Sequence, residues 1–103
     1  MRITLQWIAV IALLGAAGPS RADYELALKK NCLACHQVDK RKYGPNFKEI
    51  AAKYADQKNA ADVLAKKIRR GGTGVWGQDL MPAQPQVSAA ESRALAAYVL
   101  SLK

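Results

Sequence analysis

The sequence is poor in several residue types that other kinds of fold or site would need. It has one histidine, His36, and two cysteines, Cys32 and Cys35. A framework of several disulfides, or a zinc site completed by a second cysteine pair, therefore cannot be built from it. No alternation of apolar and polar residues predicts a strand, and no internal repeat or low-complexity tract follows residue 22. These absences exclude repeat architectures and leave a sheet-based fold without support.

Acidic residues are also scarce. Eight aspartates and glutamates face sixteen lysines and arginines, which gives a formal net charge of +8. A small basic domain is expected to associate with acidic partners through contacts that salt weakens. Nucleic acid is a poor alternative, because the sequence has no basic and aromatic recognition element and its first 22 residues are expected to direct export. We therefore expect acidic protein partners and no nucleic acid.

The longest apolar run lies at the amino terminus. A basic Met1-Arg2 precedes apolar residues 3–17, and Ser20-Arg21-Ala22 is a small-x-small cleavage site. The run is short for a membrane span, although an uncleaved anchor is the alternative. We predict a secretory signal peptide at residues 1–22, and a single periplasmic domain at residues 23–103 without stable membrane insertion. Because the signal peptide contains two arginines, the formal charge of this domain falls from +8 to +6.

The most informative pattern is Cys32-Leu33-Ala34-Cys35-His36, which matches the C-x-x-C-H motif for haem attachment. On a helical turn, residues three apart share a face, so both thiols can reach the vinyl groups of one porphyrin. The adjacent imidazole then points at the iron. A domain of 81 residues has a marginal core, which a covalently attached haem would fill. We predict one haem c bound through Cys32 and Cys35, with His36 as an axial ligand.

Other chemistries for these side chains have to be weighed. An exported thiol–disulfide oxidoreductase would use Cys32 and Cys35, but a thioredoxin-like fold places C-x-x-C beside a βαβ pattern, and no strand is predicted. A structural zinc site would have only three ligands here. A haem sensor or catalyst is a further alternative, which requires a labile sixth ligand.

Four short helices are predicted. They cover residues 24–31 with Asp23 as N-cap, residues 47–54, residues 60–70, and a last helix that starts at Ser88. Gly71-Gly72 ends the third helix, and Ser88 with Glu91 forms a capping box for the fourth. Residues 71–87 contain four glycines and two prolines, so we expect a long irregular loop there. The fold class is all-α without a sheet.

The sixth ligand of the iron has few candidates. No second histidine exists, and Met81 is the one methionine left after removal of the signal peptide. Pro82 follows it and restricts the local backbone. A lone methionine is often a core gap-filler, and a five-coordinate iron that binds small molecules is the rival outcome. We predict that His36 and Met81 are the axial pair, because a methionine ligand is usual in c-type cytochromes.

Together these motifs resemble the small bacterial class I monohaem cytochromes c. The resemblance covers nearly all of the mature chain and rests on the haem motif, Gly44-Pro45, Gly71-Gly72-Thr73-Gly74-Val75-Trp76-Gly77, Met81-Pro82 and residues 95–101. It implies the class I cytochrome c fold, with four short helices wrapped around one covalent haem. It also implies a soluble, monomeric electron carrier rather than an enzyme.

The resemblance implies further roles around the haem. The carbonyl of Pro45 would accept a hydrogen bond from the ligating histidine. Trp76 would donate its indole N–H to a haem propionate and Lys67 would lie near the same group, although a core role for Trp76 and a surface role for Lys67 are the alternatives. Gln84 stands where some relatives carry asparagine, and we expect it near the methionine sulfur.

The resemblance also implies redox proteins as partners. A quinol-oxidising complex is the expected donor, and a terminal oxidase, a nitrite reductase or a peroxidase the expected acceptor. Five basic residues flank the haem motif in sequence: Lys29, Lys30, Lys40, Arg41 and Lys42. We hypothesise that some of them steer an acidic partner toward the exposed haem edge.

Overall fold

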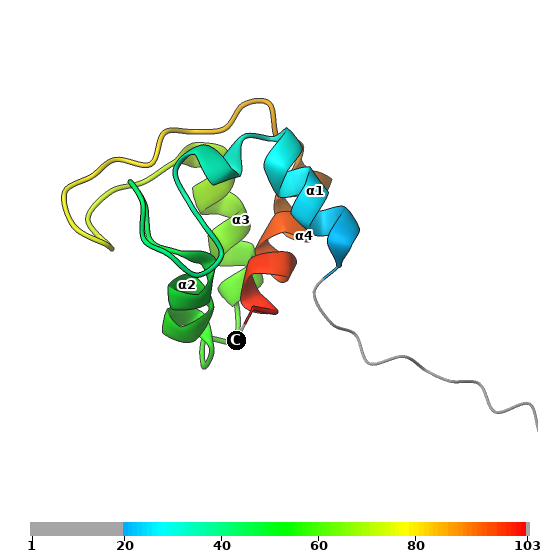
Figure 1. The fold of residues 1–103 in the computed structure, drawn as a ribbon. Coiled ribbons are helices and arrows are strands. Elements are labelled where there is room, and N and C mark those ends of the chain that lie inside the picture. Colours follow the sequence, from blue (N-terminus) through cyan, green and yellow to red (C-terminus); the bar gives the residue numbers. More distant parts are fainter. Residues whose placement is uncertain (1–19, 103) are drawn as a thin grey trace, which may run out of the picture.

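The computed structural model describes residues 20–102. Its elements are α1 (Arg21–Lys29), the 3-10 helix η1 (Cys32–Ala34), α2 (Phe47–Tyr54), α3 (Ala60–Arg70) and α4 (Ala89–Leu100). Within these residues the β-type pairing is one isolated antiparallel bridge between Gly72 and Met81. The predicted all-α fold with four short helices is confirmed (Figure 1).

Capping residues explain why α2 and α4 begin where they do. The Ser88 hydroxyl accepts a hydrogen bond from Glu91 N at 3.1 Å, and the Glu91 carboxylate accepts one from Ser88 N at 3.0 Å, as the sequence predicted. Asn46 and Glu49 form a second capping box at the start of α2, which the sequence reading overlooked. Each box satisfies two backbone donors that a helix start leaves unpaired. At the C-terminal end of α3, Gly71 adopts φ +76° and stops the helix.

Helix α1 differs from its prediction at both ends. Its N-cap is Ser20 rather than Asp23, and its C-cap is Lys30, because Asn31 adopts a left-handed φ of +68°. Asp23 lies instead in the first turn, where a carboxylate interacts favourably with the helix dipole. The predicted cleavage after Ala22 would remove the first two residues of α1. That cleavage stays a prediction, since residues 1–19 lie outside the described part of the chain.

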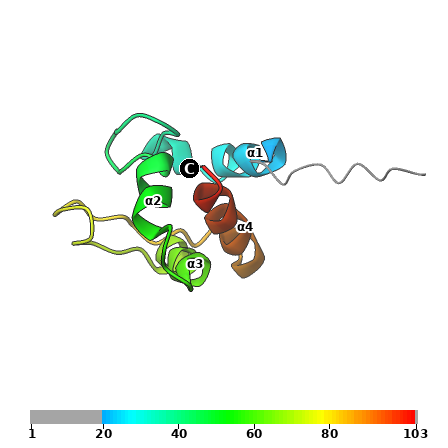
Figure 2. The ribbon, with the colours of Figure 1, turned by 90° about the horizontal axis from the view of Figure 1, so that it is seen from below.

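Helix α4 is the central element of the fold. It packs against α1 on one side and against α2 and α3 on the other (Figure 2). Where α1 approaches the core, small residues allow close packing: Ala27 is 1% exposed and Ala96 of α4 is fully buried. Leu95 is also buried, and such a leucine contributes about 2 kcal/mol of hydrophobic stabilisation. The helices thus form a thin core with one open side.

Two long connections lie on that open side. Residues 36–46 link η1 to α2, and residues 71–88 run from α3 back to α4 over the top of the view in Figure 1. Near the end of the second connection, Val87 is 4% exposed and belongs to the core. None of the helices in residues 20–102 is long and apolar enough to cross a membrane.

Candidate haem site

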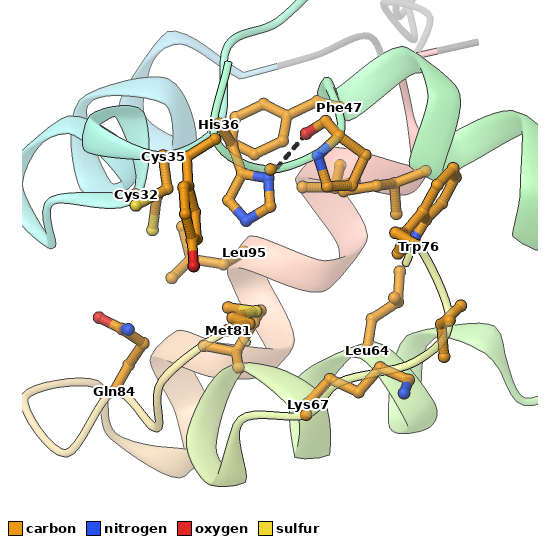
Figure 3. A pocket seen from close by; sticks show the side chains of 18 of the residues that line it. Cys32, Cys35, His36, Phe47, Leu64, Lys67, Trp76, Met81, Gln84 and Leu95 are labelled. Atoms are coloured by element: carbon orange, nitrogen blue, oxygen red, sulfur yellow. Dashed lines mark hydrogen bonds between the residues drawn. The ribbon is translucent and has the colours of Figure 1, made fainter. Parts of the chain in front are cut away.

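One cavity brings together all the site residues that the sequence predicted. It is lined by Cys32, Cys35, His36, Pro45, Lys67, Trp76, Met81 and Gln84 (Figure 3). Most of its remaining wall is apolar, with Ala27, Phe47, Ile50, Leu64, Ile68 and Leu95. Residues from all four helices and both long connections therefore face one space.

The orientation of His36 is fixed by two contacts. Its Nδ1 lies 2.7 Å from the carbonyl oxygen of Pro45, and its ring stacks on Phe47 with centroids 5.7 Å apart. A carbonyl oxygen only accepts, so Nδ1 carries a proton, and in the neutral ring Nε2 then has the lone pair. Figure 3 shows Nε2 directed into the cavity. The expected hydrogen bond from His36 Nδ1 to the Pro45 carbonyl is therefore present, and it leaves Nε2 free to bind a metal.

The ring is also confined by Gly44, a role that the sequence reading missed. A Cβ at this position would lie 2.6 Å from His36 Cε1 and 2.9 Å from Nδ1. Contacts this short do not occur for real side chains, so only glycine fits against the ring. The Gly44 amide also donates to the Cys35 carbonyl at 2.8 Å. The Gly44-Pro45 pair was recognised as part of the family resemblance, but only Pro45 was given a role beside the histidine.

The two cysteines lie on a tight turn rather than on an α-helix. The amides of Cys35 and His36 both donate to the Cys32 carbonyl, at 3.2 and 3.0 Å. Asn31 begins the turn in the left-handed region, which asparagine tolerates better than most residues. Both thiols are free, half-buried and lie at one end of the cavity (Figure 3).

The environment of Cys32 weighs against thiol–disulfide chemistry. Burial raises the pKa of its thiol above the ordinary value, against a smaller lowering by a backbone hydrogen bond. Reactive cysteines have the opposite property, since a lowered pKa is what supplies the thiolate. The fold also lacks a βαβ unit within residues 20–102. Neither observation supports the oxidoreductase alternative.

Met81 faces His36 across the cavity (Figure 3). Its backbone is held by Gly72: Met81 N donates to Gly72 O at 2.8 Å, and Gly72 N donates to Met81 O at 3.0 Å. Gly71 permits this approach, because a Cβ there would lie 2.5 Å from Met81 O. The Gly71-Gly72 pair thus both ends α3 and positions the predicted methionine ligand.

Trp76 and Lys67 line the cavity on the side away from the cysteines (Figure 3). Trp76 is half-buried, with Lys53 Nζ 5.3 Å from its ring centroid and its carbonyl accepting from Arg41 at 3.3 Å. Lys67 is half-buried as well. Their positions suit contact with an anionic edge of a bound group, and the propionate contacts themselves stay predictions.

Gln84 also lines the cavity, but its carboxamide has protein partners. Its Nε2 donates to the Pro82 carbonyl at 2.9 Å, and its Oε1 accepts from Gln86 at 2.6 Å. The expected contact with the methionine sulfur stays a prediction.

The donor set fits a covalently bound haem. Two thiols lie at one end of an apolar cavity, an imidazole nitrogen with a lone pair faces it, and a thioether lies opposite. These are the ligand types that c-type haem uses. Within residues 20–102, no group of three or more histidine, cysteine, aspartate or glutamate side chains is arranged to hold a metal ion. The zinc alternative therefore has no support.

Comparison with known proteins gives the same picture. The family model described as cytochrome c matches residues 24–103. Cytochrome c-552 of Nitrosomonas europaea is 50% identical over 99 residues, which cover 94% of this chain and 96% of that protein. Cytochrome c-552 of Hydrogenobacter thermophilus is 46% identical over 94 residues, covering 91% and 95%. The crystal structure of the Nitrosomonas protein superposes with a TM-score of 0.76 at 54% identity, covering 78% of this chain and 99% of that one.

Proposed function

Since this chain belongs to the cytochrome c family, whose members carry electrons on a covalently bound haem c, we propose that it is a periplasmic carrier with His36 and Met81 as axial ligands. The observation that supports this best is the arrangement of these two residues. They face each other across the cavity, with Cys32 and Cys35 at its end (Figure 3). The two cysteines would hold the haem through thioether bonds.

When bound, the haem supplies a one-electron Fe(III)/Fe(II) couple. The Pro45 carbonyl orients His36, which would hold the iron in one fixed direction. Met81, on the other side of the cavity, would be the second protein ligand and would raise the reduction potential, as thioether ligands do. With two protein ligands on the iron, no position would remain for a substrate, and we propose a carrier rather than an enzyme.

The apolar wall gives the cavity a second function. Phe47, Leu64 and Leu95 are buried side chains that also line it, so they exclude water from the bound group. An apolar wall without water would rearrange little when the haem iron gains or loses an electron, and this favours rapid electron exchange. Trp76 and Lys67, on the side away from the cysteines, are proposed to meet the haem propionates with an N–H donor and a positive charge.

Partner docking is proposed to rely on basic residues near the cavity. Lys29, Lys40 and Lys42 are exposed, and the connection that carries the last two also contributes Arg41 and Tyr43 to the cavity wall. Two members of the predicted set are engaged within the chain. Lys30 is 19% exposed and pairs with Glu91 at 3.3 Å, and Arg41 donates to the Trp76 carbonyl. Lys30 is therefore no longer part of the proposed docking set.

We propose acidic redox proteins as the partners of these lysines. The donor would be a quinol-oxidising complex, and the acceptor a terminal oxidase, a nitrite reductase or a peroxidase. Residues 1–22 would direct export to the periplasm, where a monomer would move between these partners. The interface is expected to be small and short-lived, as is common for electron-transfer encounters.

Spectroscopy of the purified protein with its haem tests the ligation. We expect a low-spin haem and, in the ferric state, the weak far-red band of methionine ligation. Stopped-flow mixing with a quinol-oxidising complex and then an oxidase should transfer one electron per haem. A colourless protein would contradict the haem assignment. A high-spin ferric haem would contradict Met81 ligation and favour a sensor or catalyst.

A further inference from the structure

Two residues that are 56 positions apart bind each other reciprocally. Lys30 Nζ donates to the Gln86 carbonyl at 3.1 Å, and Gln86 Nε2 donates to the Lys30 carbonyl at 3.1 Å. We name this pair of hydrogen bonds the Lys30–Gln86 clasp. Lys30 lies directly before the haem-attachment turn, and Gln86 lies near the end of the connection that carries Met81. The clasp thus joins the two segments that supply opposite sides of the site.

The hydrogen bonding continues from the clasp toward Met81. The Gln86 amide has two N–H donors, and its second acceptor is Gln84 Oε1 at 2.6 Å. Gln84 Nε2 in turn donates to the carbonyl of Pro82, which directly follows Met81. A change at Gln86 is therefore transmitted through two side-chain amides to the residue beside the ligand.

The other end of the clasp is held by α4. The Lys30 ammonium lies 3.3 Å from Glu91 Oε2, and the two side chains are 19% and 32% exposed. Glu91 is itself fixed by the capping box with Ser88. Burial and the ion pair with Glu91 already restrict the Lys30 side chain. The hydrogen bond to the Gln86 carbonyl therefore costs little additional side-chain entropy.

The remaining hydrogen bonds of the Met81 segment lead to a different part of the fold. Two hydrogen bonds join Gly72 to Met81, and the Ile68 carbonyl accepts from Gln84 N at 3.1 Å, so all three tie the segment to α3 and its end. Among residues 20–102, the clasp provides the only hydrogen bonds between segments 20–36 and 81–87. It is positioned to keep the methionine side and the histidine side of the site together.

We propose that Lys30 and Gln86 are positioning residues that slow the release of Met81 from the iron. The inference rests on the proposed ligation by His36 and Met81. Without the clasp, residues 82–86 would open from α1 more often, and the thioether would leave its position with them. Because Gln86 is exposed, each hydrogen bond is partly replaced by water when it breaks. The expected effect is thus moderate.

Displacement of Met81 by imidazole measures this release directly. At saturating imidazole, the rate of ligand exchange in the ferric protein with its haem is limited by dissociation of Met81. We expect Gln86→Leu and Lys30→Met to increase this limiting rate about 3-fold to 10-fold. Glu91→Gln, which removes the ion pair and weakens the capping bond but leaves both hydrogen bonds of the clasp, should have a smaller effect. Lys66→Met and Gln57→Leu are matched controls for charge and amide, and should leave the rate unchanged.

Each outcome separates the two proposals. If the unaltered protein lacks the far-red band, Met81 ligation is wrong and the clasp proposal falls with it. If the band is present but Gln86→Leu and Lys30→Met exchange as slowly as the controls, the ligation stands and the clasp proposal is wrong. Equal rate increases in the two variants and in the two controls would also contradict the clasp proposal. Lys30→Met keeps an aliphatic side chain, which guards against loss of the fold.

Discussion

Gly44 lies so close to His36 that no side chain fits between them. A Cβ on Gly44 would lie 2.6 Å from His36 Cε1 and 2.9 Å from Nδ1. The ring also stacks on Phe47 and is fixed at Nδ1 by Pro45. His36 therefore has one available orientation, which directs Nε2 into the cavity.

Gly44→Ala should displace the imidazole and disturb its bond to Pro45. We expect the free energy of unfolding of the protein with its haem to fall by about 1–3 kcal/mol, as overpacking usually causes. Denaturant unfolding, followed by haem absorbance, would measure it. Gly72→Ala is the control, since the nearest atom to a Cβ there is Lys67 Nζ at 3.8 Å. Equal stability of the two variants would contradict the proposed confinement.

Met81→Ala should convert the ferric haem to a high-spin form that is open to external ligands. Loss of the thioether removes the ligand that favours Fe(II), so the reduction potential should fall by on the order of 0.1 V. Protein-film voltammetry and the far-red absorption band would test both expectations. Leu80→Ala, at the neighbouring exposed position, should retain the band and nearly the same potential. A retained band in Met81→Ala would show that another residue ligates the iron.

The sequence allowed the bounds of α2 and α3 and the N-cap of α4 to be predicted because their signals are local. Apolar spacing marks the buried faces, and Gly71 and Ser88 mark helix ends. The start of α1 differs because the prediction was made for a chain cleaved after Ala22. In the structure the helix begins earlier, with Ser20 as its N-cap.

Features that depend on distant contacts were beyond the sequence. Nothing near Lys30 in the chain indicates that Gln86 and Glu91 bind it, so it was grouped with exposed docking lysines. The steric role of Gly44 likewise depends on where the His36 ring lies in three dimensions. The cysteines and the histidine in the cavity wall were predicted because they belong to one short motif whose chemistry is specific.

Trp76→Phe would test the proposed indole contact with a haem propionate. The substitution keeps an aromatic ring and removes the N–H donor. A carboxylate that loses a hydrogen bond is a stronger negative charge near the iron, which stabilises Fe(III). We expect the reduction potential to fall by on the order of tens of millivolts.

Lys53→Met, which removes only the cation 5.3 Å above the ring, is the control and should shift the potential less. An unchanged potential in Trp76→Phe would indicate a packing role.

Lys40→Gln and Lys42→Gln should slow electron exchange with anionic reagents. Ferricyanide is a suitable probe, because its negative charge is attracted to the same basic surface. At low ionic strength we expect each substitution to lower the oxidation rate about 2-fold to 3-fold, and the difference to vanish as salt is added. Lys66→Gln is the matched control, since Lys66 is also exposed but lies on α3, outside the connection of residues 36–46 that carries Lys40 and Lys42. Rates that are independent of ionic strength would exclude electrostatic steering.

Stability at low pH should depend on Glu91. The Ser88 backbone N–H, and to a lesser degree the Lys30 side chain, lowers the pKa of the Glu91 carboxyl in the folded state. A group whose pKa is lower when folded stabilises the protein above its unfolded pKa, about 4.3. That stabilisation is lost as pH falls from there through the folded-state pKa. Glu91→Gln should therefore be less stable than the unaltered protein at pH 7, and the gap should close on acidification.

Urea unfolding at a series of pH values, followed by circular dichroism, would measure this gap. Glu25→Gln provides the control, because the Glu25 side chain is 64% exposed and pairs only weakly with Arg21 at 3.5 Å. Its difference from the unaltered protein should be small at every pH. If the Glu91→Gln gap persisted unchanged well below pH 4, the stabilisation would come from side-chain packing. The ionised carboxylate at the start of α4 would then have no part in it.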